Sequence, residues 1–128
     1  MGQGEPVYIA AYPWRGVSGH AHNVRFRNIF AGSDNGVLIQ SEEPGCISGR
    51  VFDGLRVEID RWSGRAGGHW DLRPHPSNGV IEPVTHGIHL EQIADVTGRD
   101  CEVTWAQPPG ERSPDLRNAL NVSRVDGL

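Results

Sequence analysis

Ser33-Asp34-Asn35-Gly36-Val37-Leu38-Ile39-Gln40 joins a polar turn to a short strand in which side chains alternate between two faces. The same junction recurs in weaker copies at residues 6–10, 86–91 and 118–122. Self-similarity at a spacing of tens of residues is typical of repeat architectures. The fold prediction for the whole chain is therefore based on the repeats of this junction.

The copies of the junction are regularly spaced except at one place. The first strand of each copy begins near Val7, Val37, Ile88 and Leu120. A second strand begins near Val24, Arg50, Val96 and Leu128. In both series the step from the second copy to the third is much longer than the other two steps. If one coil takes about 26–30 residues, the excess is an insertion of roughly 20 residues at about 60–85.

Short strands with long spacings predict stacked parallel strands, because no Asn-Gly hairpin pairs one strand with the next. We therefore expect an all-β fold, a right-handed parallel β-helix of about four coils, with residues 1–128 as a single β-helix fragment. Alternate residues of each strand would point into or out of the coil. The predicted interior positions are Val7, Ile9, Val37, Ile39, Ile88, Leu90, Leu120 and Val122. The predicted outward positions are Tyr8, Leu38, His89 and Asn121, with Ala10, Gln40 and Glu91 beside them.

The composition excludes some classes of protein. Because 17 residues are Gly and 9 are Pro, turns should be many and long helices few. A net charge of −4, with no basic segment, argues against a nucleic-acid partner. No apolar run is long enough for a membrane helix, and the first residues lack the features of a secretory signal.

The cysteines and histidines do not predict a metal centre or another cofactor. Cys46 and Cys101 are too few for a disulfide framework, and we expect each to be a free, buried or half-buried thiol. Two pairs of histidines have a spacing that zinc sites use, His20 with His22 and His86 with His89. No third ligand is identifiable, so hydrogen-bonding histidines are the favoured interpretation. A calcium site would need clustered carboxylates, which the sequence lacks.

At the level of motifs, the chain from about residue 20 resembles glycoside hydrolase family 28, the polygalacturonase-like β-helix family. The resemblance rests on Asn23-Val24-Arg25-Phe26, on Ser33-Asp34-Asn35-Gly36-Val37, and on residues 67–74, 87–90 and 118–120. It implies hydrolysis of a glycosidic bond in a plant-type polysaccharide and an extracellular or periplasmic location. The chain would be the C-terminal part of a longer β-helix.

The chain departs from this family in the chemistry. Family members have catalytic aspartates in an Asn-Thr-Asp motif and an Asp-Asp pair, and neither motif occurs here. The Arg and Lys that hold a uronate carboxylate fall on Leu38 and Gln40. We therefore predict no catalytic residue, and we expect this chain alone to be inactive. The loss of both cations argues against an acidic sugar.

Candidate substrate-binding residues come from the outward positions and from the insertion. They are Leu38, Gln40, His69, Trp70, Asp71, Arg73, His89 and Glu91. Aromatic and polar side chains together suit a sugar ring, and long loops on a rigid scaffold often have functional roles. The alternative for the insertion is structural, with Trp70 covering the flank and Asp71 paired with Arg73 or Arg61. Asp34 and Asn35 are interpreted as turn residues, because Asx before Gly favours a tight turn.

Two other functions stay open. One is a non-catalytic β-helix module that binds a glycan or another chain, and the other is a truncated product with no stable function. Neither end shows a cap, so we expect edge-to-edge self-association of the isolated chain. The expected partner is a polysaccharide or oligosaccharide, with no nucleic acid and no membrane. Catalytic motifs encoded upstream of Met1 would favour the hydrolase interpretation over the binding module.

Overall fold

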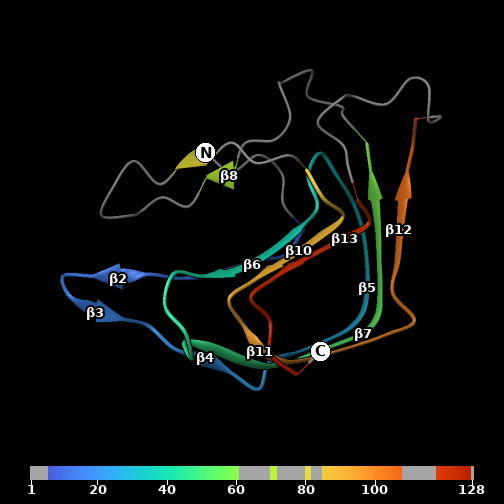
Figure 1. The fold of residues 1–128 in the computed structure, drawn as a ribbon. Helices are drawn as coiled ribbons and strands as arrows, with labels where there is room; N and C mark the ends of the chain where they lie inside the picture. The colour runs from blue at the N-terminus through green and yellow to red at the C-terminus, as the bar shows by residue number, and fades with distance from the viewer. Residues whose placement is uncertain (1–5, 61–69, 72–79, 82–84, 108–117, 128) are drawn as a thin grey trace.

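A computed structural model of the chain describes residues 6–60, 70–71, 80–81, 85–107 and 118–127. These residues form an all-β structure with two parallel sheets (Figure 1). The strands are β1 (Tyr8–Ala11), β2 (Pro13–Trp14), β3 (Val17–Ser18), β4 (Ala21–His22), β5 (Arg25–Ser33), β6 (Val37–Ser41), β7 (Ile47–Ile59), β8 (Trp70–Asp71), β9 (Val80–Ile81), β10 (Ile88–Glu91), β11 (Ala94–Arg99), β12 (Glu102–Trp105) and β13 (Leu120–Ser123).

The first sheet has the order β1-β6-β10-β13, and all its pairs are parallel. Its register aligns Tyr8 with Leu38, Leu38 with His89, and His89 with Asn121. The register therefore confirms the alignment of these strands that their spacing in the sequence predicts.

The second sheet is centred on β7. Strands β4 and β5 pair with one edge of β7 and β11 and β12 with the other, all in parallel. Figure 1 shows β7 running along the bottom of the view and then turning upward beside β5 and β12. Strands β6 and β10 are each followed directly in sequence by strands of the second sheet. Strand β1 is followed by the β2–β3 pair and then by β4 and β5 of the second sheet.

The bends in the second sheet come from residues with a left-handed backbone. Asn23, Gly49, Asp95 and Gly127 occupy one level of the stack and have φ of 55°, 66°, 54° and 67°. Only Gly, and to a lesser extent Asn and Asp, adopt this conformation at low cost. A second such level consists of Asn28 (φ 52°), Gly54 (φ 73°) and Asp100 (φ 51°).

Glycine just before β6 and β10 lets successive strands of the first sheet approach. A Cβ on Gly36 would lie 2.7 Å from the carbonyl carbon of Gly87, and a Cβ on Gly87 would lie 2.6 Å from the carbonyl oxygen of Ala119. Val37 N donates to Gly87 O at 2.8 Å, so the backbones are in direct contact there. The glycine in the Ser33–Gly36 turn is therefore required by the neighbouring strand.

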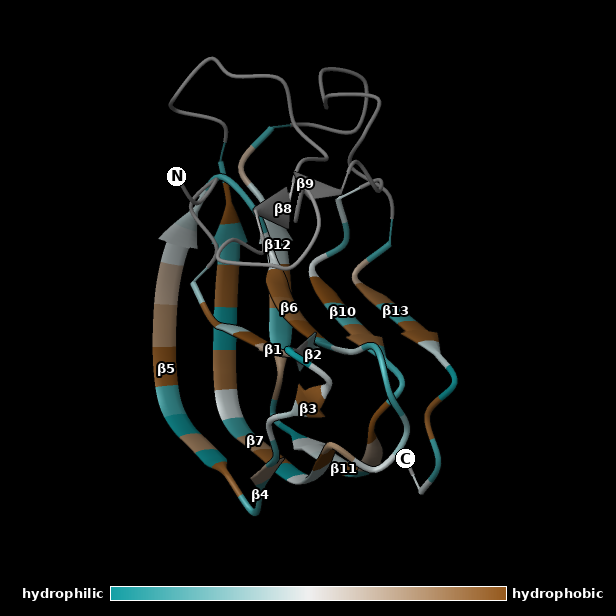
Figure 2. Cartoon of the chain, turned by 90° about the vertical axis from the view of Figure 1, so that its left-hand side faces the viewer, coloured by the Kyte–Doolittle hydropathy of each residue, from teal (hydrophilic) through white to brown (hydrophobic). Residues whose placement is uncertain are grey.

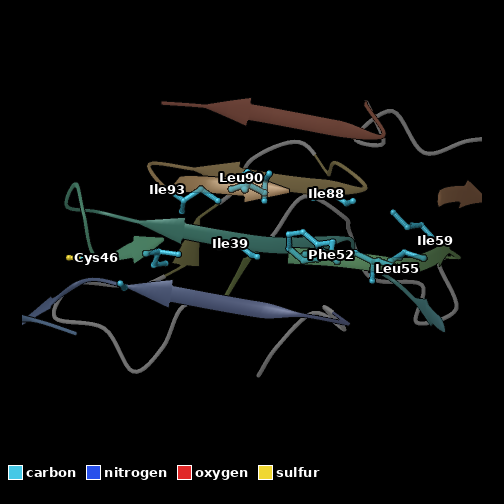
Figure 3. Packing of buried hydrophobic residues seen from close by; sticks show 13 residues of the cluster. Ile39, Cys46, Phe52, Leu55, Ile59, Ile88, Leu90 and Ile93 are labelled. Atoms are coloured by element: carbon cyan, nitrogen blue, oxygen red, sulfur yellow. The ribbon is translucent and has the colours of Figure 1, made fainter. Parts of the chain in front are cut away.

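The core lies between the two parallel sheets (Figure 3). Its buried members are Ala11, Val37, Ile39, Cys46, Ile47, Phe52, Leu55, Val57, Ile59, Ile88, Leu90, Ile93 and Val96. Figure 2 shows apolar and polar residues alternating along β7, as expected for a strand with one buried face.

The antiparallel pair β2–β3 lies outside the two parallel sheets. One prediction about the core needs correction. Leu120 and Val122 face the same side as the core residues of β10, but they are 49% and 37% exposed. No strand pairs with the far edge of β13 within the described chain, so neither side chain is covered as its counterparts are.

Candidate functional site

The outward face of the first sheet contains a group of polar side chains. The alternation of β10 and β13 places Ile88 and Leu90 toward the core and His89 and Glu91 outward. Because the strands are parallel and in register, Asn121 lies beside His89, and Gln40 lies beside Glu91 on the other edge of β10. A rigid sheet thus aligns these side chains in columns.

Four of the outward residues are connected by hydrogen bonds and an ion pair. His89 Nδ1 lies 3.0 Å from Asn121 Nδ2, and His89 Nε2 lies 3.3 Å from Glu91 Oε2. Arg124 Nη2 donates to Glu91 Oε1. We call His89, Glu91, Asn121 and Arg124 the polar row.

The hydrogen bonds assign one tautomer to a neutral His89. Because Asn121 Nδ2 is a donor, His89 Nδ1 accepts, and its Nε2–H then donates to Glu91. The side chains of His89 and Glu91 are 12% and 22% exposed, whereas Arg124 is 63% exposed. The polar row therefore presents a shielded imidazole and carboxylate beside an accessible cation.

A buried histidine, His86, packs against the polar row. The His86 ring stacks on the His89 ring with a centroid separation of 5.7 Å, and His86 is 6% exposed. Asn118 N donates to His86 Nδ1 at 3.4 Å. This contact fixes the orientation of the imidazole beneath His89.

Gln40 extends the outward face from Glu91 toward β1. It is half-buried, and its Oε1 is buried with no hydrogen-bond partner within the described residues. A buried amide oxygen without a donor costs about 1–3 kcal/mol.

Leu38 is not accessible to a ligand, although the sequence predicts that it lines the groove. It faces outward in the register with Tyr8 and His89, but it is only 1% exposed. Tyr8 and His89 flank it in the neighbouring strands, and burial of an isobutyl side chain is favourable. The prediction that Leu38 forms an accessible groove residue is therefore wrong, while Gln40, His89 and Glu91 keep some exposure.

The turn interpretation of Asp34 and Asn35 is confirmed. Ser33 Oγ donates to the carbonyl oxygen of Asn35 at 2.6 Å, which closes the bend before β6. Asn35 is 1% exposed, so its side chain belongs to the interior of the bend and is not a surface group.

Two of the four candidate residues of the insertion, His69 and Arg73, lie outside the described residues. Trp70 and Asp71 form β8, which pairs antiparallel with β9 through Trp70–Ile81 and Asp71–Val80. Their proposed contacts with sugar, or with the flank, stay predictions.

The other histidine pair is hydrogen-bonded on a different part of the surface. His22 Nδ1 lies 2.6 Å from Ser48 Oγ, and the His20 and His22 rings stack with centroids 5.6 Å apart. Within the described chain, no group of three or more His, Cys, Asp or Glu side chains is arranged to hold a metal ion. Cys46 and Cys101 are both free, with Cys46 buried as predicted but Cys101 exposed.

Two arginines, one beside the site and one in the interior, are not among the residues that the sequence predicts to be important. Arg124 follows β13 directly and was not recognised, because its partner Glu91 is 33 residues away. Arg50 is fully buried, and its guanidinium donates to the carbonyl oxygens of Ser48 (2.8 Å) and Ala21. Desolvation lowers the pKa of Arg50 from its usual value. Its place in the interior column with Val24 and Val96 was the available signal.

The fold and site define an all-β protein with parallel sheets and a polar row on one outward face. Comparison with protein-family models, curated proteins and solved structures found no match. Among the described residues, no helix is long and apolar enough to cross a membrane.

Proposed function

We propose that the chain is part of a right-handed parallel β-helix of the glycoside hydrolase family 28 kind, formed by about four coils near its C-terminal end. The constant register between four strands that lie far apart in the sequence supports this proposal. The two levels of left-handed Asn, Asp and Gly residues support it too, since a coil must bend at the same place in every turn.

We further propose that the outward face of the first sheet contributes to a groove for a polysaccharide or oligosaccharide. The observation that carries this proposal is the polar row, aligned in register beside Gln40. Sugar hydroxyls both donate and accept hydrogen bonds. The carboxylate, amide, imidazole and guanidinium groups together provide both hydrogen-bond acceptors and hydrogen-bond donors for these hydroxyls.

The proposed role is construction of the groove, without catalysis by this chain. Inverting hydrolysis needs a general acid and a general base about 6.5–9.5 Å apart. Among the outward residues of the four paired strands, Glu91 is the single carboxylate, and Arg124 pairs with it. An intact hydrolase would need its catalytic groups elsewhere.

The absence of a second carboxylate among the outward residues of these paired strands also favours the other candidate function, a non-catalytic glycan-binding module. For either function, a neutral sugar is the better substrate class. Leu38 is buried and Gln40 is uncharged, so neither can make a charge-assisted contact to a uronate. The cation of the polar row, Arg124, is already paired with Glu91. An extracellular or periplasmic location would follow from the family resemblance.

Glycan binding tests the groove directly. We expect the chain to bind neutral plant-type oligosaccharides in calorimetric titrations, more tightly than oligogalacturonates. His89→Ala and Asn121→Ala should each weaken binding about fivefold to tenfold, since each removes a hydrogen bond worth about 1 kcal/mol. Glu58→Ala is the matched control, because Glu58 is exposed on the second sheet. Equal affinities for all variants, or no binding, would contradict the proposal.

Hydrolysis tests the second part of the proposal. A reducing-sugar assay on polygalacturonate and on neutral polysaccharides should show no release above buffer. Robust release that Glu91→Gln abolishes would overturn the view that this chain lacks its own catalytic residues.

A further inference from the structure

The histidine pair His20 and His22 takes no part in the proposed sugar groove. His20 directly precedes β4, and His22 belongs to it, so the pair lies beside the second sheet, whereas the polar row lies on the first (Figure 1). In the register with β7, Ala21 aligns with buried Ile47 and His22 with Ser48, so His22 points to the solvent side of the sheet. The two imidazole rings stack with centroids 5.6 Å apart, which places both on this side.

The ring nitrogens of this pair are more available than those of His86 and His89. Within the described residues, the contact of His22 Nδ1 with Ser48 Oγ is the one hydrogen bond that either ring of the pair makes. In His89, by contrast, both ring nitrogens have partners in the polar row. His20 and His22 are also exposed, whereas His86 is buried. The pair beside β4 can therefore offer imidazole nitrogens to a ligand.

The contact with Ser48 orients the His22 imidazole in the way that a metal ligand requires. His22 Nδ1 lies 2.6 Å from Ser48 Oγ, and a hydroxyl oxygen can accept from an Nδ1–H group. This tautomer leaves the lone pair of Nε2 for a ligand. Histidines that bind metal ions commonly donate their other ring N–H in this way, which fixes both the tautomer and the ring orientation.

The backbone around the pair is held from the interior. Ala21 lies between the two histidines, and its N donates to Cys46 O at 2.8 Å. The carbonyl oxygen of Ala21 accepts from the guanidinium of buried Arg50, which also donates to the carbonyl oxygen of Ser48 at 2.8 Å. Arg50 thus ties the strands that contain His22 and Ser48 together, so that binding of an ion would require little reordering of the backbone.

The separation of the two rings suits chelation of one ion by both imidazoles. A zinc–nitrogen bond is about 2.0–2.1 Å long. With about 109° between two such bonds at a tetrahedral ion, the ring centroids would lie about 5 Å apart, and the structure places them 5.6 Å apart. Within the described residues, no third His, Cys, Asp or Glu side chain joins the pair. Water would therefore occupy the remaining positions of the ion.

We propose that His20 and His22 form a surface site for a divalent transition-metal ion, with Ser48 as the residue that orients His22. Imidazole is a ligand for zinc, copper and nickel ions, whereas calcium and magnesium ions prefer oxygen ligands. The site is independent of the sugar groove, because no residue of the polar row belongs to it.

Titration of the full chain with Zn²⁺, followed by NMR, tests this site residue by residue. We expect Zn²⁺ to shift the imidazole signals of His20 and His22 together and to leave those of His86 and His89 unchanged. Ca²⁺ and Mg²⁺ should shift none of them. His20→Ala and His22→Ala should each weaken binding at the remaining histidine more than about tenfold, because a single imidazole cannot chelate. Both histidines are exposed, so the variants should fold.

A serine variant separates orientation of the ligand from loss of a ligand. Ser48→Ala keeps both imidazoles and should weaken Zn²⁺ binding about tenfold. Ser18→Ala is the matched control, because the Ser18 hydroxyl donates to Glu43 and not to a histidine, and it should leave Zn²⁺ binding unchanged. The proposal is overturned if Zn²⁺ in large excess shifts neither signal. It is also overturned if His20 binds Zn²⁺ equally well in the His22→Ala variant, since each imidazole would then act alone.

Discussion

Strands β6 and β13 belong to the same sheet and have the same alternation of side chains, yet their apolar residues differ in exposure to solvent. Val37 and Ile39 of β6 are fully buried, whereas Leu120 and Val122 of β13 are 49% and 37% exposed. Strand β6 has a paired strand on each side, and β13 has a described partner only at β10. In a stack of parallel strands, burial of an interior residue thus depends on both neighbours, and its own sequence pattern is not sufficient.

The largest expected effect comes from the close approach on which this stacking depends. Gly36→Ala places a Cβ against the backbone of Gly87, which has no flexible side chain that could move away. We expect a loss of more than about 3 kcal/mol in the free energy of unfolding, measured by urea denaturation. Gly19→Ala is the control, because a Cβ there meets nothing within 4 Å, and it should change stability little. Equal stability of the two variants would contradict the packing of β6 against β10.

A pair of leucines tests the comparison between inner and terminal strands. Leu90 is 2% exposed and Leu120 is 49% exposed, on neighbouring strands of one sheet. Leu90→Ala should cost about 3 kcal/mol, because it leaves a cavity, and Leu120→Ala about 1 kcal/mol or less. Chemical denaturation of both variants checks this difference. If both lost the same stability, Leu120 would be buried by a neighbour in solution.

The left-handed bends should show an intermediate effect. Gly49 has a φ of 66°, and a Cβ there would meet the Asn23 side chain. Gly49→Ala should therefore cost about 1–2 kcal/mol in thermal or chemical unfolding. Asn23→Gly, at the same level of the stack, keeps the left-handed conformation accessible and should cost less than Gly49→Ala. The reverse order would argue against the bend as the source of the effect.

The smallest effect is expected on the solvent side of the second sheet. Arg56 and Glu102 are 4.0 Å apart and 62% and 58% exposed, so solvent screens their attraction. A double-mutant cycle of Arg56→Ala and Glu102→Ala should give a coupling energy below about 0.5 kcal/mol, decreasing with added salt. A coupling above about 1.5 kcal/mol would show that this pair is desolvated in solution.

Much of the fold followed from the sequence, because a period of two sets the face of each strand and the repeat spacing sets the register. The alignment of Val7, Val37, Ile88 and Leu120 was predicted in this way. Of the candidate site, the sequence placed Gln40, His89 and Glu91 on one outward face. The Ser33–Gly36 turn was also predicted, since Asx before Gly has a strong local preference.

The tertiary structure decided what local pattern does not specify. Leu38 is buried and Cys101 is exposed, because the neighbouring strands determine how much of each side chain meets solvent. The tertiary structure also joined Arg124 to Glu91 and Asn121 to His89, although each pair is far apart in the sequence. Periodicity determines which way a side chain points, whereas exposure and pairing depend on atoms from distant parts of the chain that only the folded stack brings together.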